Sequence, residues 1–281
     1  MRESSPKRPF SGERKRRAFG QHFLKDASVI RETLDAFLQG ARALGAKSLV
    51  EIGPGGGALT DPLLQAWENW GPNPPALRLF ERDRDIASGW RERAEGKGWS
   101  VVEGDFMDAP DSTWSEPAPV AVLSNLPYSA GTAIAQRLLA AGPHVPFAVL
   151  MFQAEVGRRF RAPAGDSDRG SLSVWAQNFW DIDRIKFVPP GAFKPPPKVN
   201  SEVLRFRRRA EPRIQGSAEH PELWQRLIKT AFAQRRKMLR SNFAQEPWKQ
   251  ALVRSKVDGT LRAQALDWPD WQALLASAVE G

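Results

Sequence analysis

The sequence contains no cysteine and only three histidines among its 281 residues. The lack of cysteine excludes disulfides, thiolate metal ligands and cysteine nucleophiles. The histidines, His22, His144 and His220, lie far apart along the chain. We therefore expect neither a metal site nor a catalytic triad built on histidine. Long apolar runs are also missing: no stretch of about 18 apolar residues occurs, so no transmembrane helix is expected.

A secretory signal is missing as well. The first twenty residues are basic but lack the apolar core that such signals need. The composition, 41% hydrophobic and 26% charged, is typical of a globular protein. We expect a soluble, cytoplasmic protein without a membrane partner, and a monomer.

The net charge of +9 is concentrated at the two ends of the chain. Residues 1–25 carry eight Lys or Arg and two acids, and residues 201–281 carry fifteen and nine, whereas the middle of the chain is slightly acidic. Each basic run alone is compatible with ordinary solubilising charge. Their concentration at both ends favours a polyanionic partner, because clustered cations release counterions from phosphates.

Short apolar runs alternate with helical patterns through the first half of the chain. Residues 48–53, 77–81, 100–105, 120–127 and 147–153 are typical of buried strands, and residues 27–40, 58–70 and 132–142 of helices. This alternation predicts βαβ units, with helices on both faces of a parallel sheet.

The second half of the chain follows a different pattern. Residues 183–190 and 201–208 predict two strands that pair antiparallel at the edge of the sheet, because the proline-rich connection is too short for a helical crossover. After residue 208 only helical patterns occur, over 220–243, 246–255 and 269–279. We expect a flexible basic arm over residues 1–17, an α/β domain over 18–208 and a small all-helical domain over 209–281.

The glycine-rich stretch VEIGPGGGALT follows the first strand of the predicted sheet and opens a helix. Gly53, Gly55 and Gly57 permit tight turns and close approach of a ligand. The stretch also satisfies the dinucleotide fingerprint if Ala58 takes the last position. It predicts a cofactor at the carboxyl end of this strand, although a structural turn rich in glycine is an alternative.

Acidic residues end the next two predicted strands. Glu81 is placed to accept both hydroxyl hydrogens of a ribose, which NAD and S-adenosylmethionine share. Asp105 is placed to accept from an adenine amine, and Phe106 offers an apolar face to the ring. Either acid alone is equally compatible with a helix N-cap. Together with the glycine loop, they predict a site for an adenosine-containing ligand.

The stretch VLSNLPYSA ends the fourth predicted strand with an amide, a proline and the chain's only tyrosine. The side-chain oxygen of Asn125 and a backbone carbonyl near Leu126 are suited to hold the two hydrogens of an adenine amine. Pro127 stiffens the turn. Tyr128 is suited to stack on an extruded base. The alternative is an ordinary strand end, where Asn and Pro are common.

Several motifs resemble one family. NLPY resembles the adenine-N6 methyltransferase signature. In order along the chain, RRAFGQHFLKD, VEIGPGGGALT, Glu81, EGDF, LMFQAEVGRRF, LSVWAQ, FKPPPKVNSEV and AFAQRRKMLRSN resemble signatures of the small-subunit ribosomal RNA adenine-N6,N6-dimethyltransferases. The resemblance covers residues 16–243. It implies a Rossmann-like class I methyltransferase sheet, followed by a helical RNA-binding domain.

The resemblance also implies roles for individual residues. Two adjacent adenosines near the 3′ end of small-subunit RNA would each receive two methyl groups from S-adenosylmethionine, on the 30S pre-ribosomal particle. Cofactor contacts are implied for Gln21, His22, Leu24, Gly53, Gly55, Glu81, Asp105, Phe106 and Asn125. Target-base contacts are implied for Asn125, Leu126, Pro127, Tyr128 and Phe193, and RNA contacts for Arg235, Arg236, Lys237 and Arg240.

Some features keep other interpretations open. The family often has Asn in place of His22 and Tyr in place of Arg169. Phe193 is also compatible with a buried position in a rigid edge connection, and the basic residues at 235–240 with a solvated helix face. Rival functions are a nicotinamide dehydrogenase, a non-catalytic RNA-binding factor and a large-subunit RNA adenine methyltransferase. The dehydrogenase leaves NLPY unexplained.

Overall fold

The computed structural model describes residues 22–280, so the predicted basic arm and Gln21 lie outside the described residues. Two compact units form. Of the described residues, the first comprises those up to Ala154 together with Arg184–Phe206, and the second comprises Glu155–Asp183 and those from Arg207 onward.

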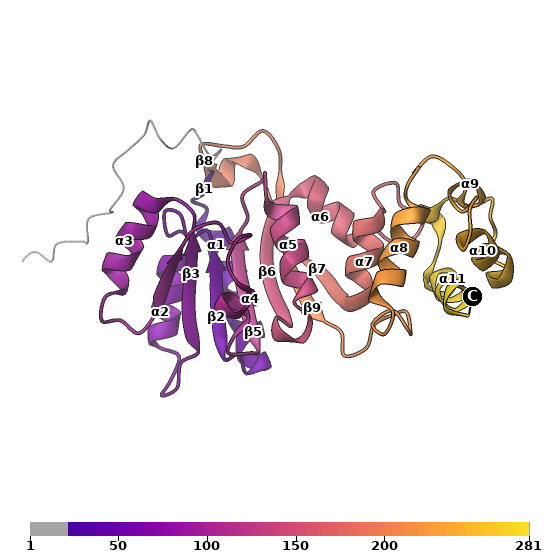
Figure 1. Ribbon diagram of the computed structural model, residues 1–281. Coiled ribbons are helices and arrows are strands. Elements are labelled where there is room, and N and C mark those ends of the chain that lie inside the picture. Colours follow the sequence, from indigo (N-terminus) through magenta and orange to yellow (C-terminus); the bar gives the residue numbers. More distant parts are fainter. Residues whose placement is uncertain (1–21, 281) are drawn as a thin grey trace, which may run out of the picture. The chain divides into compact units, whose positions relative to one another are not determined.

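The described residues form nine strands, labelled in Figure 1. The strands are β1 (Phe23–Leu24), β2 (Ser48–Ile52), β3 (Ala76–Glu81), β4 (Ser100–Glu103), β5 (Val120–Asn125), β6 (Phe147–Gln153), β7 (Trp180–Val188), β8 (Phe193–Lys194) and β9 (Ser201–Arg208). The helices are α1 (Ala27–Leu44), α2 (Thr60–Glu68), α3 (Arg84–Ala94), α4 (Asp111–Ser115), α5 (Gly131–Ala140), α6 (Ala154–Arg161), α7 (Ser171–Phe179), α8 (Pro221–Ala231), α9 (Leu239–Asn242), α10 (Trp248–Ser255) and α11 (Trp268–Val279). Three short 3₁₀ helices are η2 (Gly142–His144), η3 (Pro190–Ala192) and η4 (Ala263–Ala265).

Seven strands form one sheet in the order β4-β3-β2-β5-β6-β9-β7. β2 pairs in parallel with both β3 and β5, and β5 pairs in parallel with β6. The chain therefore moves outward from β2 to β4 and returns to the other side of β2 as β5. Such a reversal of strand order is where open α/β sheets bind ligands. The predicted α/β fold is confirmed, and β7 and β9 are neighbours with β7 at the edge.

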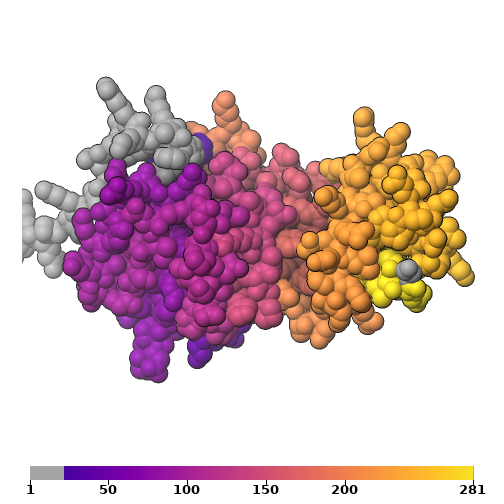
Figure 2. Space-filling model, viewed as in Figure 1, coloured from indigo at the N-terminus to yellow at the C-terminus, as the bar shows by residue number. Residues whose placement is uncertain are grey.

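Helix α1 shows how the sequence fixes the elements of the first unit. Asp26 caps its start by accepting from the backbone N–H groups of Ser28 and Val29 at 2.9 and 3.0 Å. Gly45, with a φ of 64°, ends it. Phe37 lies on its buried face and is fully enclosed. This face packs on β5 and β6, so one stripe of apolar residues supports the centre of the sheet. In the space-filling view of Figure 2, side chains fill the gaps that the ribbon drawing leaves between the strands and helices of this unit.

A small second sheet pairs β1 with β8 in antiparallel orientation, with Leu24 opposite Phe193. Their ribbons lie side by side in Figure 1. The backbone N–H of Lys25 extends this contact by donating to the Ala192 carbonyl at 2.8 Å. Residues 22–25 are thereby fixed beside Phe193, although about 170 residues separate them in the sequence.

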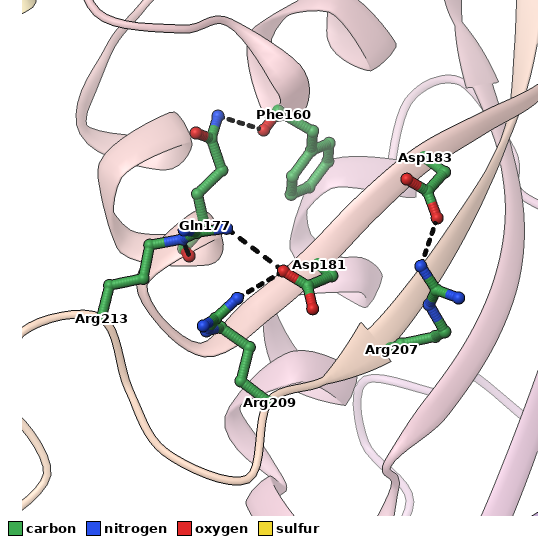
Figure 3. A network of polar contacts seen from close by, with 7 residues as sticks. All are labelled: Phe160, Gln177, Asp181, Asp183, Arg207, Arg209 and Arg213. Carbon is green, nitrogen blue, oxygen red and sulfur yellow. Dashed lines mark hydrogen bonds and ion pairs between the residues drawn. The ribbon is translucent and has the colours of Figure 1, made fainter.

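In the second unit, charged side chains join its two chain segments (Figure 3). Asp181 accepts from Arg209 at 2.5 Å and from Arg213 at 3.1 Å. Asp183 accepts from Arg207 at 2.8 Å. These groups are partly exposed, so each pair contributes little alone. Together they connect β7 to the end of β9 and to the segment that follows it.

The helix predicted over 220–243 is wrong in its second half. Helix α8 ends at Ala231, residues 232–238 form turns, and α9 is only one turn long. Tertiary hydrogen bonds replace the helical ones: the Asn242 side chain donates to the Ala231 carbonyl at 2.6 Å, and the Leu239 N–H donates to the Leu261 carbonyl at 2.7 Å. Neither Gly nor Pro marks this break, so the local pattern could not reveal it.

Candidate functional site

A cavity opens at the carboxyl ends of β2, β3, β4 and β5, where the order of the strands reverses. We call it the strand-end cavity. Its lining includes most of the residues that the sequence singled out. These are His22, Leu24, Gly53, Gly55, Glu81, Asp105, Phe106, Asn125, Leu126, Pro127, Tyr128 and Phe193. Residues from six separate stretches of sequence thus meet in one place within the first unit.

The glycine loop lies at the floor of this cavity. Gly53, Gly55 and Gly57 have φ values of 72°, 49° and 86°, a region that side chains other than glycine rarely adopt. A Cβ atom at Gly57 would lie 3.0 Å from the Trp90 ring. The Trp90 indole donates to the Gly55 carbonyl at 3.0 Å and holds the loop in place. The loop is therefore a fixed cradle of backbone atoms.

Glu81 braces the loop from the end of β3. Its two carboxylate oxygens accept from the backbone N–H groups of Gly55 at 3.0 Å and Asp83 at 2.9 Å. Burial raises the pKa of this carboxyl, while the two backbone hydrogen bonds oppose that rise. Asp83, not Glu81, caps helix α3. A carboxylate has about four acceptor sites, so Glu81 keeps acceptor capacity for a ribose hydroxyl.

Asp105 and Phe106 form another wall. One Asp105 oxygen accepts from the Met107 N–H at 2.9 Å, and the other lies 3.4 Å from the Arg82 guanidinium. Asp105 therefore stabilises a turn and caps no helix. The Phe106 ring is 3% exposed, and Arg137 holds its segment by donating to the Phe106 carbonyl. The wall thus combines a carboxylate with an apolar ring edge.

Glu51, which sequence reasoning missed, also lines the cavity. It is only 2% exposed. Its Oε1 accepts from the Thr60 hydroxyl at 3.0 Å, and its Oε2 has no hydrogen-bond partner among the described residues. Burial raises the pKa of this carboxyl to about 8. The sequence does contain one sign of Glu51: an acidic residue inside an otherwise apolar strand that leads into a glycine loop.

Asn125 is the last residue of β5, and its backbone pairs with Met151 of β6. Within residues 22–280 its side-chain amide has no hydrogen-bond partner, and the Leu126 carbonyl accepts no hydrogen bond. The Pro127 carbonyl, in contrast, accepts from Ala130 and from Gly131 at the start of α5. Two oxygen acceptors thus remain available at the tip of the strand. This is the arrangement that binding of an exocyclic amine requires.

Tyr128 is half-buried beside this tip. Its hydroxyl is hydrogen bonded to the Ser201 hydroxyl at 2.7 Å, and its ring centroid lies 5.6 Å from that of His22. Burial raises the pKa of the Tyr128 phenol, and the Ser201 hydrogen bond opposes this rise. Ser201, which anchors the Tyr128 hydroxyl, gave no signal in the sequence because Tyr128 is 73 residues away.

The remaining predicted residues of the cavity lie around β1 and β8. The His22 Nδ1 is 2.8 Å from the Pro195 carbonyl, to which it donates. This contact ties His22 to the loop that follows β8. Leu24 and Phe193 are 5% and 2% exposed and belong to the core while lining the cavity. The predicted roles of these residues stay predictions.

The four predicted RNA contacts belong to the second unit, and they differ among themselves. Arg235 donates to the carbonyls of Ser167 and Arg169 at 2.8 and 2.9 Å, so it fastens a loop. Arg169 itself is 1% exposed and stacks on the Trp268 ring at 5.4 Å. Arg236, Lys237 and Arg240 are exposed. They lie on turns and a short helix, not on the continuous helix face considered above.

The described residues contain no cluster of three or more His, Asp or Glu side chains that could hold a metal ion. Nor does any helix of residues 22–280 combine the length and apolar character that crossing a membrane requires. The cavity offers backbone amides, carboxylates, an amide and aromatic rings. These groups suit binding and orientation of an adenosine-containing cofactor and a second planar base.

Comparisons with known proteins agree with this chemistry. The family model for ribosomal RNA adenine dimethylase matches residues 12–275. Ribosomal RNA small subunit methyltransferase A from Syntrophotalea carbinolica is 40% identical over 229 residues, covering 82% of this chain and 81% of the relative. The protein of that name from Methylibium petroleiphilum is 37% identical over 269 residues, covering 95% and 97%.

Solved structures support the same fold. A dimethyladenosine transferase from Plasmodium falciparum has a TM-score of 0.70 at 23% identity, covering 92% of this chain and 98% of the other. The 23S rRNA methyltransferase ErmE has a TM-score of 0.66 at 26% identity, covering 92% and 99%. The family match spans most of the chain and favours a methyltransferase over a dehydrogenase. This chain belongs to the ribosomal RNA adenine dimethylase family.

Proposed function

We propose that this chain transfers methyl groups from S-adenosylmethionine to N6 of two adjacent adenosines near the 3′ end of small-subunit ribosomal RNA, twice on each base. Its family and the names of its relatives support this assignment. The observation that carries it is Asn125, which ends β5 and lines the same cavity as the glycine loop and Glu81, with no hydrogen-bond partner for its side-chain amide among residues 22–280. The protein would act as a monomer on the small-subunit particle in the cytoplasm.

The lining residues fit the proposed cofactor. Glu81 retains acceptor capacity for a ribose hydroxyl, and Asp105 is placed to accept from the adenine amine beside the Phe106 ring. The loop at Gly53 and Gly55 admits close approach, because a Cβ at Gly53 would meet nothing within 4 Å. When bound, the cofactor supplies an electrophilic methyl group on a sulfonium sulfur.

Asn125 and the Leu126 carbonyl would orient the target amine. The lone pair of this nitrogen is delocalised into the adenine ring, and the nitrogen becomes nucleophilic as it turns pyramidal and the lone pair leaves conjugation with the ring. In the first transfer, two fixed acceptors, one for each amine hydrogen, favour that geometry, and in the second transfer one of them holds the remaining hydrogen. Tyr128 would stack on the extruded base, and Phe193 would border it. The rate would then come from positioning and preorganised dipoles, with no strong base required.

Replacement of Asn125 with Ala tests this assignment. We expect kcat for methyl transfer to undermethylated small subunits to fall by about a hundredfold or more, the magnitude typical of losing one preorganised polar group. Cofactor affinity, measured by calorimetry, should stay within about threefold, because Gly55, Glu81 and Asp105 remain. Asn69→Ala, at the exposed end of α2, is the matched control. Turnover near that of the unaltered protein by the Asn125 variant would refute the role.

The substrate is tested separately. Purified small and large ribosomal subunits are each incubated with the protein and cofactor labelled in the methyl group, and the labelled base is mapped. We expect label only on adjacent adenosines near the 3′ end of the small-subunit RNA. Label on large-subunit RNA alone would move the assignment to the activity named for ErmE. Cofactor binding without label on either subunit would indicate a non-catalytic RNA-binding factor.

A further inference from the structure

Ser201 is a buried polar residue that lies next to the strand-end cavity without lining it. It is the first residue of β9 and has no exposed surface. Its hydroxyl lies 2.7 Å from the Tyr128 hydroxyl, and each group completes the other's hydrogen bonding. A buried hydroxyl without a partner is destabilising, which favours the bonded arrangement.

The backbone beneath Ser201 is itself fixed. The carbonyl of the preceding residue, Asn200, accepts from the Ala154 N–H at 2.9 Å. The Ser201 hydroxyl is therefore an anchor on a strand of the sheet. Tyr128, in contrast, begins the turn after β5 and is only partly buried. One hydrogen bond to a fixed point restricts both rotatable bonds of the tyrosine side chain.

A second contact limits the position of the Tyr128 ring. The His22 ring lies 5.6 Å from the Tyr128 ring at an angle of 34°, and His22 is held by the Pro195 carbonyl. Tyr128 is thus held at its hydroxyl by Ser201 and at its face by His22. The remaining part of the ring is free to line the cavity beside Asn125.

We propose that Ser201 is a positioning residue for methyl transfer, which acts through the Tyr128 hydroxyl to hold the aromatic ring in the orientation that receives the target base. The inference rests on the base-stacking role of Tyr128 in the proposed function. Ser201 touches neither base nor cofactor in this scheme. Its effect is to lower the number of ring orientations before the base arrives, which raises the rate of a step that depends on alignment.

Kinetics of three variants test the proposal. Ser201→Ala and Tyr128→Phe each remove one partner of the same hydrogen bond. We expect each to lower kcat by about fivefold, the factor that corresponds to one ordinary hydrogen bond, with KM for the cofactor unchanged within about twofold. The double variant should be no slower than the slower single variant, because the second change has nothing left to remove.

Fluorine NMR gives a readout independent of activity. Tyr128 is the chain's only tyrosine, so protein labelled with 3-fluorotyrosine shows a single resonance that reports this ring. We expect Ser201→Ala to shift and broaden it. Ser48→Ala is the matched control, because Ser48 is equally buried but bonds the Pro117 carbonyl at the opposite, amino end of β2. That control should leave both the resonance and kcat unchanged.

The outcomes separate the two claims. An unchanged resonance and unchanged kcat in Ser201→Ala overturn the positioning role, as do single-variant effects on kcat that multiply in the double variant. If Ser201→Ala does not fold, Tyr128→Phe alone still tests the role, because it removes the hydrogen bond without emptying a buried site. A kcat of Tyr128→Phe equal to that of the unaltered protein then overturns the role. An unaltered protein that transfers no methyl group refutes the proposed function instead.

Discussion

Replacement of Glu51 with Gln should remove a large pH-dependent loss of stability. Glu51 is 2% exposed, and its Oε2 has no partner among the described residues. Burial is the main cause that raises its pKa from 4.5 to about 8, and the nearby charges of Asp61 and Glu81 add to the rise. The hydrogen bond from Thr60 opposes it. Gln keeps the shape and the acceptor for Thr60 but carries no proton to lose.

The sign follows from the protons bound in each state. Below pH 4.5 the Glu51 carboxyl is protonated in both the folded and the unfolded protein, so it does not change the free energy of unfolding with pH. Between pH 4.5 and about 8 the folded protein keeps a proton that the unfolded chain releases. The free energy of unfolding therefore falls by about 1.4 kcal/mol for each pH unit in this window. Above the window the total loss is about 5 kcal/mol.

Denaturant unfolding without cofactor, followed by tryptophan fluorescence, measures this effect. We expect Glu51→Gln and the unaltered protein to have similar stability near pH 4, and the variant to be more stable by several kcal/mol near pH 9, on the order given by the proton linkage. Glu68→Gln is the control, because Glu68 lies exposed on α2. Stability curves of the Glu51 variant and the unaltered protein that stay parallel across this range would refute the reasoning.

Two further predictions concern the basic residues Arg235, Arg236 and Lys237 and the glycine loop. The double variant Arg236→Ala/Lys237→Ala should lower the slope of log affinity for RNA against log salt concentration by about 1.5, as salt titrations would measure. Arg235→Ala should mainly lower the free energy of unfolding, by about 1 kcal/mol, because two loop carbonyls lose their donor. Denaturant unfolding measures this second effect. Gly57→Ala should lower the free energy of unfolding by about 2 kcal/mol or more, because φ is 86° and the new Cβ meets other atoms at 3.0 Å. Gly191→Ala is the control and should not lower it, because a Cβ at Gly191 meets no described atom within 4 Å.

The sequence was sufficient to predict the sheet and the polar residues at its carboxyl edge. Parallel strands bring their carboxyl ends to one edge, so a residue recognised as the end of a strand is also located in space. Glu81, Asp105 and Asn125 could be placed together for this reason, and the structure puts all three on the strand-end cavity. Their position needed only strand order and direction, which local patterns carry.

Other features depended on distant partners. The break after Ala231 has no Gly or Pro and results from hydrogen bonds to Asn242 and to the loop at Leu261. The second compact unit joins residues 155–183 to the chain from 207 onward, through contacts such as that of Asp181 with Arg209. Periodicity within a window of the sequence contains no information on either pairing.

The same distinction explains which site residues were missed. Asn125 and Tyr128 stand out because an amide and an aromatic ring after a buried strand need a reason of their own. Ser201 does not stand out by residue type, and its proposed role rests on the 2.7 Å contact with Tyr128. A residue suited to contact a substrate is recognised by its own chemistry. A residue that holds such a side chain in place is recognised only by what it contacts. Mutational searches of such sites should therefore begin from the buried polar contacts of the visible residues, and Ser201 is the first case to test.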